Sequence, residues 1–342
     1  MERSLLHDEV GRRLNSGLHN FWYPVLPSWR LHSSPYGITR LSQRIVLWRD
    51  EGGEVHALDD RCPHRGAPLS RGRNLGSRIA CWYHGIEVGG DGSIGSVPAV
   101  NGCPLEGRHL VRSYPVQEIA GAIFLWFGET DAQPSELHLP DEISDSSNSY
   151  FLSAFHWACS YRYAIDNLMD PMHGSYLHAV SHSMSKGLRQ ATILASETDA
   201  GVMVERDNQK GVNFDWVEFG TSGMMWLRLD LPYAERYGPG GPFRIIGVMT
   251  PIDEHHCFVF QWRLRQVDGW ERDVWRFLYR VRLEGLHWDV LEQDRAILES
   301  MSDDAREHEH LYQNDIGLVK VRKRLQAMAV AEIEAEQSTG TR

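Results

Sequence analysis

The chain has 342 residues, of which 24% are charged and 42% hydrophobic, and its formal net charge is −11 at pH 7. A chain of this length is expected to form more than one hydrophobic core, so two domains are predicted. The acidic balance argues against a nucleic-acid partner, because phosphate binding requires a basic surface.

Cysteine usage and hydropathy indicate the compartment. The five cysteines are an odd number at irregular spacing: Cys62, Cys81, Cys103, Cys159 and Cys257. In a large chain this is typical of a reducing environment and of metal or core roles, not of a disulfide framework. No stretch is apolar for long enough to predict a membrane span, and the first residues lack the apolar segment of a signal peptide. We therefore expect a cytoplasmic protein.

The first part of the chain alternates short strands with loops. Residues 1–20 predict an amphipathic helix, and residues 38–59 predict two strands joined by a turn at Gly52-Gly53. Two loops follow, Cys62-Pro63-His64 and Cys81-Trp82-Tyr83-His84. Each loop therefore carries one cysteine and one histidine, in the pattern C-x-H, sixteen residues, C-x2-H.

Two cysteines and two histidines are the ligands of a Rieske [2Fe–2S] cluster, in which the cysteines hold one iron and the histidines the other. Gly66 and Gly85 permit tight turns whose backbone amides can point at the cluster. The alternative is a Cys2His2 zinc site, which uses the same ligand types. Structural zinc more often has paired-cysteine loops, so the pattern favours the cluster.

Residues 90–95 match G-x-G-x-x-G but do not predict a dinucleotide site. Such a site needs the string between a strand and a helix, whereas Asp91-Gly92 signals a hairpin and Ser96-Val97-Pro98 follows. Reducing equivalents are therefore expected from another protein. Residues 128–149 are rich in Pro, Ser and Asp and predict the boundary between a domain at 1–135 and a domain at 136–342.

The second domain opens with a dense group of polar side chains at residues 166–178. Two imidazoles and one carboxylate form the facial triad that holds non-haem iron(II) and leaves positions open for dioxygen. His173 and His178 are five residues apart, about 140° around an ideal helix, so a shared metal requires a distorted turn, which Gly174 would permit. His178 with His182 is the rival pair, and a polar helix end with two exposed histidines is the plain alternative.

Residues 191–264 alternate as about six antiparallel strands, and residues 271–300 form the longest helical pattern. Residues 318–336 predict a further, charged helix. Core packing explains most apolar side chains of the strands, but some could line an apolar substrate pocket. The candidates are Trp216, Met224, Trp226 and Phe243. Arg228, Arg244 or Arg263 could pair with a substrate carboxylate, although a solvated sheet face would also explain each of them.

Both metal motifs together resemble the Rieske non-haem iron oxygenases. The residues that carry the resemblance are Cys62-Pro63-His64-Arg65-Gly66, Cys81-Trp82-Tyr83-His84-Gly85, and Asn167 to His173 with His178. The branch with the vanillate and dicamba demethylases and the phthalate and carbazole-type oxygenases is most similar. It implies an α+β fold, with a small antiparallel β Rieske domain and a helix-grip domain whose sheet wraps a long C-terminal helix. Trp82 and Ile86 depart from the family's proline and tryptophan, which is expected to alter the surface around the cluster.

The resemblance also implies roles for residues. It implies mononuclear iron held by His173, His178 and Asp294, an inter-subunit electron bridge through Asp170, and Asn167 near the iron. It further implies the terminal oxygenase of a multicomponent system, supplied from NAD(P)H by a flavin-dependent reductase with or without a ferredoxin, and a homotrimer. Hydroxylation of an aromatic substrate by mono- or dioxygenation is expected, with oxidative O- or N-demethylation as the alternative. A Rieske electron carrier without mononuclear iron chemistry is the alternative from another class.

Overall fold

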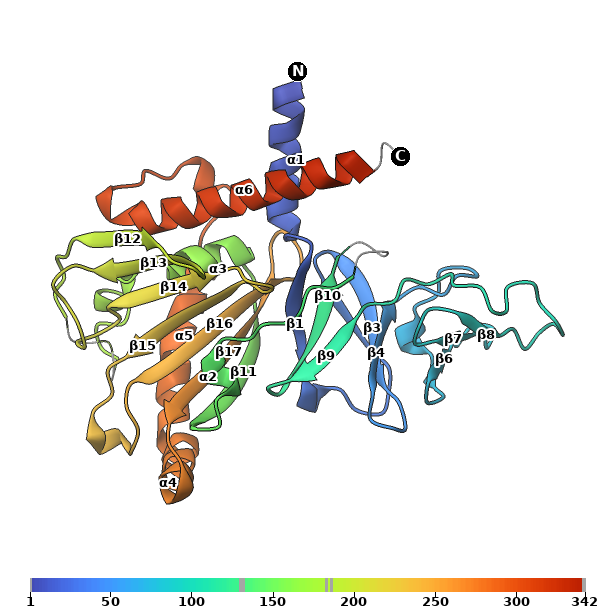
Figure 1. Ribbon diagram of the computed structural model, residues 1–342, viewed down its shortest axis with the longest axis horizontal. Coiled ribbons are helices and arrows are strands. Elements are labelled where there is room, and N and C mark those ends of the chain that lie inside the picture. The colour runs from blue at the N-terminus through green and yellow to red at the C-terminus, as the bar shows by residue number, and fades with distance from the viewer. Residues whose placement is uncertain (1, 129–132, 182–183, 185–186, 340–342) are drawn as a thin grey trace. The chain divides into compact units, whose positions relative to one another are not determined.

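The computed structural model describes residues 2–128, 133–181, 184 and 187–339. Its contacts divide the chain into one unit of residues 19–136 and another of residues 1–18 with 137–342 (Figure 1). In the part of the chain that is described, no helix has the length and apolar character needed to cross a membrane.

The unit of residues 19–136 consists of three small antiparallel sheets. The first has the order β1 (Phe21–Pro27), β10 (Ala122–Phe127), β9 (Val116–Ile119). The second is β2 (Tyr36–Arg40), β3 (Gln43–Arg49), β4 (Val55–Asp59). The third is β5 (Arg73–Asn74), β6 (Arg78–Ala80), β7 (Glu87–Gly89), β8 (Ile94–Ser96). Short 3-10 turns, η1 (Ser28–Arg30) and η2 (Leu69–Arg71), connect them. Cys62 and Cys81 belong to a buried apolar cluster with Trp48, Leu69 and Ile86, so this core positions both cysteine loops.

The second unit is built on one seven-stranded antiparallel sheet. Its strand order is β11 (Asn148–Trp157), β17 (Cys257–Gln266), β16 (Phe243–Pro251), β15 (Trp226–Leu231), β14 (Trp216–Gly220), β13 (Gly201–Arg206), β12 (Ile193–Glu197). The six strands expected between residues 191 and 264 are present, and β11 adds a seventh beside β17.

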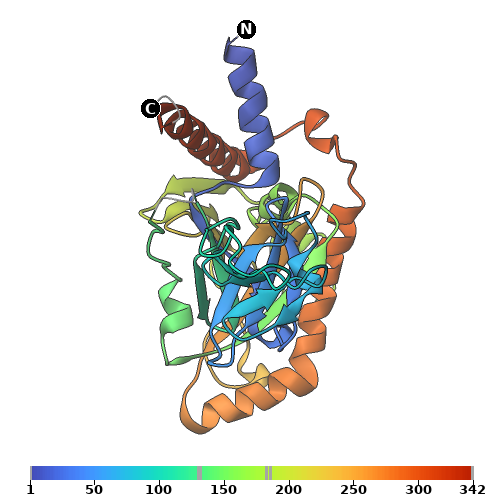
Figure 2. The ribbon, with the colours of Figure 1, turned by 90° about the vertical axis from the view of Figure 1, so that its right-hand side faces the viewer.

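Helices lie on both sides of this sheet. They are α2 (Asp141–Ser144), α3 (Tyr161–Leu168), α4 (Gly269–Leu278), α5 (Glu284–Glu299) and α6 (Ile316–Thr339), with short turns η3 (His173–Ser175), η4 (Glu235–Tyr237), η6 (Ala305–Glu307) and η7 (Gln313–Asp315). The predicted helix at 271–300 is α4 and α5 joined by a π-helical segment, η5 (Tyr279–Leu283). Figure 2 shows the chain turning a corner between α4 and α5, so the bend lies at η5, just before Gly285. The antiparallel sheet and the long helix packed on it confirm the predicted α+β fold.

The two faces of the sheet have different partners. On the face that we call inner, the ring of Phe243 stacks on His287 of α5 at 4.3 Å, and Gly247 faces the side chain of Leu168 in α3. On the outer face, Arg228 pairs with Glu142 of α2 at 2.6 Å. Figure 1 shows α5 behind the strands and α2 in front of them. Because side chains alternate along a strand, this assignment settles which strand residues can face α5.

The N-terminal helix α1 (Glu2–Ser16) belongs to the second unit, which corrects its expected place in the domain at 1–135. Its Arg13 donates hydrogen bonds to Glu332 at 2.9 Å and Glu336 at 2.7 Å, both on α6. The hydroxyl of Tyr161 in α3 donates to the carbonyl of Leu14 at 2.8 Å. These partners lie more than 140 residues away in the chain, so the local pattern of α1 did not reveal them.

Arg13→Ala is expected to lower the free energy of unfolding by about 1 to 2 kcal/mol, because two partly buried ion pairs to α6 are lost. Chemical denaturation measures this difference. Arg12→Ala is the matched control, since Arg12 is exposed on the same helix and its loss should change stability by less than about 0.5 kcal/mol. Equal effects of both substitutions would contradict the docking of α1 on α6.

Candidate metal centres

The two cysteine loops of the first unit close in the same way. In the first loop the amide of Cys62 donates to the carbonyl of Ala67 at 2.8 Å, and the amide of Gly66 donates to the carbonyl of Cys62 at 2.9 Å. The second loop repeats both bonds, at 2.8 and 2.9 Å, around Cys81. Gly66 and Gly85 have φ angles of 76° and 73°, a left-handed conformation that favours glycine. The loops therefore present two equivalent pairs of side chains.

The four candidate ligands are arranged by type. Cys62 and Cys81 are buried, whereas His64 and His84 are exposed with ring centroids 4.7 Å apart. Burial raises the pKa of the Cys62 thiol to about 11, while the amides of His64 and Arg65, directed at its sulfur, lower it. Amide donors aimed at a buried sulfur fit a metal-bound thiolate. The donor set thus fits a cluster with a buried cysteine side and an exposed histidine side.

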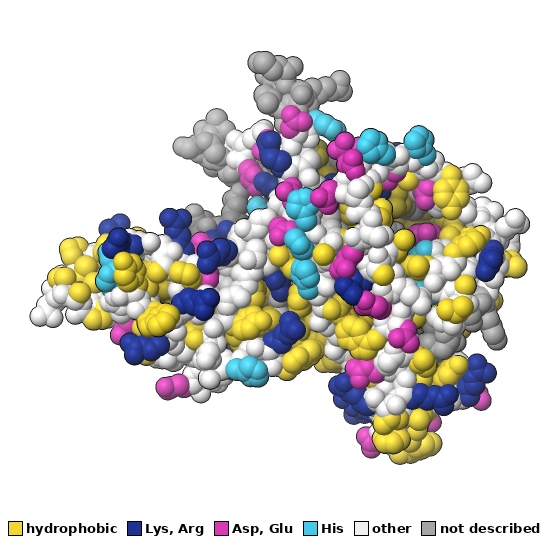
Figure 3. All heavy atoms as spheres, turned by 180° about the vertical axis from the view of Figure 1, so that it is seen from behind, with side chains coloured by type: hydrophobic (Ala, Val, Ile, Leu, Met, Phe, Trp, Pro, Cys, Tyr) yellow, Lys and Arg dark blue, Asp and Glu magenta, His cyan; other side chains and the backbone are white. Residues whose placement is uncertain are grey.

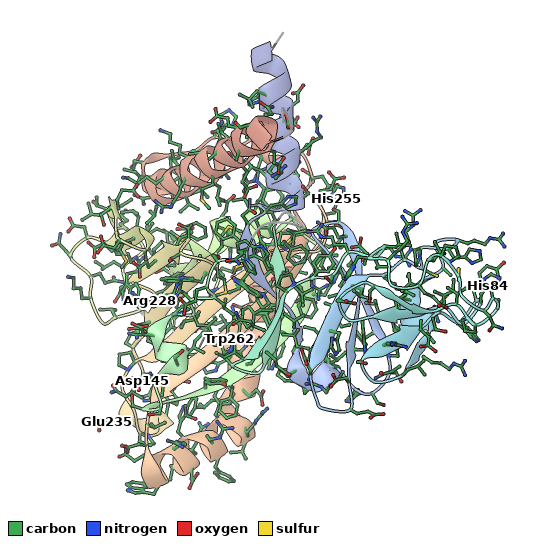
Figure 4. The ribbon with its side chains drawn as sticks, turned by 45° about the vertical axis from the view of Figure 1, so that its right-hand side comes forward. His84, Asp145, Arg228, Glu235, His255 and Trp262 are labelled. Carbon is green, nitrogen blue, oxygen red and sulfur yellow. The ribbon has the colours of Figure 1, made fainter. Side chains whose placement is uncertain are left out.

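Aromatic side chains surround the exposed histidines. Figure 4 shows His84 in an end loop of its unit. Trp82 and Tyr83 are 75% and 55% exposed, and the guanidinium of Arg65 lies 5.4 Å from the Tyr83 ring. Ile86, in contrast, is buried in the core of the unit. Of the two departures from the family pattern, only Trp82 alters the surface beside the cluster site.

In the second unit, three side chains distant in sequence meet at one point. One nitrogen each of His173 and His178 and an oxygen of Asp294 lie within 4.8 Å of one another. The Nε2 atoms of His173 and His178 lie 3.6 and 3.1 Å from Oδ1 of Asp294. His178 and Asp294 are 0% and 3% exposed, yet the Nε2 atom of His178 makes no hydrogen bond among the described residues. Two imidazole nitrogens and a carboxylate oxygen that converge in this way, with Nε2 of His178 buried and without a hydrogen bond to a described residue, fit a metal site.

The turn that brings the histidines together is local. Helix α3 ends at Leu168, and Pro171 follows, which cannot continue a helix. His173 then opens the 3-10 turn η3, which is the distorted geometry that the spacing of the histidines requires. The rival ligand His182 lies outside the described residues.

Both imidazoles are oriented through their other nitrogen. Nδ1 of His173 lies 2.6 Å from the carbonyl oxygen of Asp170, and Nδ1 of His178 lies 2.8 Å from Oε1 of Gln293. An Nδ1–H group that donates to these oxygens leaves the lone pair of Nε2 free to bind a metal. Burial acts to lower the pKa of His178, but Asp294 and Gln293 outweigh it and raise this pKa above its ordinary value.

Three polar residues surround the triad: Asn167, Asp170 and Gln293. Nδ2 of Asn167 donates to Oδ1 of Asp294 at 3.1 Å, which places Asn167 beside the triad. The carboxylate of Asp170 accepts from the amide of Met172 at 2.7 Å, so it is the backbone carbonyl of Asp170 that holds His173. Sequence reasoning missed the role of Gln293. Its position next to Asp294 was the only signal, and nothing local linked it to His178, 115 residues earlier.

The proposed substrate residues divide between the two faces of the sheet. Trp216 and Trp226 flank Arg228 on the outer face, with the guanidinium 6.0 and 5.6 Å from their rings. This corrects their expected role, because the triad lies on the opposite side with α3 and α5. Phe243 lies on the inner face and stacks on His287 of α5, and its role in a substrate pocket stays a prediction. Met224 is buried in the loop before β15.

Two family models match the chain, one over each unit. The Rieske [2Fe-2S] domain matches residues 21–115, and the vanillate O-demethylase oxygenase C-terminal domain matches residues 157–331. The first match covers all four cluster candidates, and the second covers the triad. Oxygenases with these two domains carry a Rieske [2Fe–2S] cluster and mononuclear iron.

Curated relatives are similar over about half of their length. The vanillate O-demethylase oxygenase subunit of a Pseudomonas species is 37% identical over 163 residues, 47% of this chain and 45% of the relative. The dicamba O-demethylase oxygenase component of Stenotrophomonas maltophilia is 36% identical over 164 residues, 47% of this chain and 48% of the relative.

Solved structures share the fold. A crystal structure of dicamba monooxygenase bound to dicamba has a TM-score of 0.75 at 23% identity, over 93% of this chain and 99% of that one. The terminal oxygenase of carbazole 1,9a-dioxygenase from a Novosphingobium species has a TM-score of 0.77 at 21% identity, over 94% of each chain. Because the match at 157–331 alone covers more than half of the sequence, the chain belongs to the Rieske non-haem iron oxygenases, in the branch with a vanillate O-demethylase oxygenase C-terminal domain.

Proposed function

We propose that this protein is the terminal oxygenase component of a multicomponent Rieske oxygenase system and hydroxylates an aromatic substrate by mono- or dioxygenation. The observation that carries the proposal is the meeting of His173, His178 and Asp294 in a chain that also has a Rieske domain. An electron carrier would need only the Rieske domain. Oxidative demethylation is the second candidate, favoured by the two demethylase relatives with 37% and 36% identity.

In this proposal Cys62 and Cys81 hold one iron of the cluster, and His64 and His84 hold the other. The cluster supplies single electrons, and a mononuclear iron(II) held by three protein ligands offers open positions for dioxygen beside the substrate. The buried cysteines keep water from the sulfur side. The exposed histidines, with Trp82 and Tyr83 around them, form the side through which a redox partner would make contact.

At the proposed iron site, this chain's residues act by orientation. The Asp170 carbonyl and Gln293 hold the two Nδ1–H groups, so that both Nε2 lone pairs point to one place. Asn167 donates to Oδ1 of Asp294 and restrains that carboxylate. A facial set of two nitrogens and one oxygen leaves the opposite side for small ligands.

The proposed function requires redox partners. A flavin-dependent reductase, directly or through a ferredoxin, would supply electrons, since no dinucleotide site is expected on this chain. Ferredoxin complexes are known for the carbazole 1,9a-dioxygenase oxygenase, a structural neighbour. A homotrimer is proposed from the family resemblance. Exposed apolar side chains on α4 and η5 offer a surface for contact between subunits, where Trp270, Phe277 and Val281 are 72%, 66% and 60% exposed. Figure 3 shows hydrophobic and basic side chains gathered over the α4 end of this unit. A cytoplasmic location stays a prediction.

Metal analysis of anaerobically purified protein tests the proposal. The wild type should contain about three irons and about two acid-labile sulfides per chain. His173→Ala and Asp294→Ala should each lose one iron and keep both sulfides. Asp289→Ala, which removes an exposed carboxylate from the same helix as Asp294, is the matched control and should keep all three irons. Two irons in every sample would indicate an electron carrier, and zinc without sulfide would refute the cluster.

Gln293→Leu should weaken iron binding at the triad about 10- to 100-fold, because the Nδ1–H group of His178 loses its acceptor. Iron retained during titration with a chelator measures this change, and the sulfide content should not move. Gln293→Glu keeps an acceptor oxygen and should stay close to the wild type. Glu292→Leu is the control, since Glu292 bonds only Arg295 among the described residues. Equal iron loss in Glu292→Leu and Gln293→Leu would exclude a specific role for Gln293.

Asp170→Asn should slow electron transfer to the mononuclear iron while all metals stay bound. The side-chain amide oxygen of the introduced asparagine can still accept from the amide of Met172, so the local turn is preserved. Two rates are measured: reduction of the cluster by a surrogate reductase, and product formation in a single turnover. Only product formation should slow, by about 10-fold or more.

Sedimentation tests the assembly and should give three times the chain mass of 39.1 kDa. A monomer with unimpaired turnover would exclude the proposed bridge between subunits.

A further inference from the structure

Three arginines of the second unit are almost fully buried, and one of them differs in its partners. Arg206, Arg263 and Arg265 are each 1% exposed. Arg206 donates to the Leu188 carbonyl and the Ser175 hydroxyl, and Arg265 donates to the carbonyls of residues 237, 240 and 241. These oxygens compensate part of the lost hydration of the two guanidinium groups, although Nε and Nη1 of Arg206 and Nε of Arg265 are also buried without a hydrogen-bond partner among the described residues.

Arg263 has far fewer acceptors. Its one hydrogen bond to a described residue runs from Nη1 to the hydroxyl of Tyr279, at 2.6 Å. Its Nη2 atom is buried and has no hydrogen-bond partner among the described residues, and no described carboxylate lies within 4.0 Å of the guanidinium. A buried cation without a counter-charge is strongly unfavourable unless an anion or further acceptors complete its surroundings. Within the described part of the chain, the site around Arg263 therefore has no negatively charged partner.

Arg263 lies on the inner face, toward the helix that carries Asp294. In the sheet it stands between Phe151 of β11 and Ile245 of β16, and Phe151 stacks on Tyr279 at 4.2 Å. The guanidinium is 5.5 Å from the ring of Trp288 on α5. Trp288 precedes Asp294 by six residues on this helix, a rise of roughly 9 Å. Arg263 therefore lies beside α5, the helix that carries Asp294.

A second polar atom without a partner among the described residues lies on the same face as Arg263. Gln261 is two residues earlier on β17 and therefore on the same face, with its Oε1 atom buried and not hydrogen-bonded. It pairs with Gly247 of β16, which faces Leu168 of α3, the neighbour of Asn167. The inner face thus carries a glycine, an amide oxygen and a cation beside an indole ring, on neighbouring positions of β16 and β17.

We propose that Arg263 binds the acid group of an aromatic carboxylate substrate, with the Trp288 ring beside the aromatic body and the reactive substituent directed toward His173, His178 and Asp294. A guanidinium binds a planar carboxylate through two parallel hydrogen bonds, and its free Nη2 atom suits such a pair. A sulfonate offers the same charge with a tetrahedral shape. The direction toward the triad depends on the proposed function, whereas recognition of the acid by Arg263 does not.

Calorimetric titration of the iron-replete protein with matched ligands tests this inference without turnover. The probes are para-methoxybenzoate, the neutral para-methoxybenzamide and para-methoxybenzenesulfonate. The wild type should prefer the benzoate to the amide, and Arg263→Gln should lower the affinity for benzoate about 10- to 100-fold while leaving that for the amide nearly unchanged. Arg263→Lys should restore part of the preference. The sulfonate arm shows whether the site requires a planar acid group or accepts any oxyanion.

The ratio of the two affinities is measured within each variant, so a general loss of stability does not imitate the result. Arg244→Gln is the matched control, because Arg244 lies on the outer face and pairs with Asp230 at 2.6 Å, so its ratio should equal that of the wild type. If Arg263→Gln does not fold, Arg263→Met combined with Tyr279→Phe serves instead, because it removes both partners of the hydrogen bond between these two side chains.

Wild-type protein that does not bind the acids, or binds acid and amide alike, would overturn the inference, and so would variants at Arg263 that keep the wild-type ratio. If the protein binds benzoate more tightly than benzamide through Arg263 but oxidises none of the bound acids, the result would count against the proposed function alone. Suppose instead that the wild type oxidises a neutral substrate and that Arg263→Gln keeps the wild-type ratio of benzoate affinity to benzamide affinity. That result would count against this inference alone.

Discussion

The burial of Asp294 between two histidines is the interaction on which the second unit depends. A carboxylate that is 3% exposed needs compensation, and here an amide from Asn167 supplies one hydrogen bond while two imidazole nitrogens face the same oxygen. The arrangement requires α5 to lie against both α3 and the turn that carries His173 and His178. The sheet supplies that support, because its inner face packs on α5 through Phe243 and on η5 through Phe151.

The geometry of the two cluster loops depends on contacts between residues that are close together in the chain. Each loop needs a cysteine inside the core and a histidine two or three residues later at the surface. A left-handed glycine and two backbone hydrogen bonds produce this reversal within six residues, and the same solution appears twice. Because the geometry is local, the spacing of C-x-H and C-x2-H was sufficient to predict it. The exposure of Trp82 and Tyr83 then follows from where the core ends.

The arginines on the two faces of the sheet differ in how their charges are compensated. Arg228 and Arg244 on the outer face are paired with Glu142, Glu218 and Asp230, so their charges are already compensated. Arg263 on the inner face has one hydrogen-bond partner among the described residues, the phenol of Tyr279. An arginine without a counter-ion on the face that carries the catalytic candidates contributes little to stability, which is why a ligand is the natural partner to infer.

The sequence by itself predicted the cluster loops, the strands and the long helical pattern, because these depend on periodicity and on residues close together in the chain. The α+β architecture and the preference for His173 with His178 over His178 with His182 came from the family resemblance. The sequence also indicated Asp294, but only through resemblance, since no local rule links a helix near the C-terminus to histidines more than 100 residues earlier. Tertiary structure alone decided that Gln293 orients His178, that α1 packs on α6, and that Trp216 and Trp226 face away from the triad. Each of these depends on which side of an element meets a distant neighbour. Alternation along a strand separates its two faces, but only packing decides which of them is buried against α5.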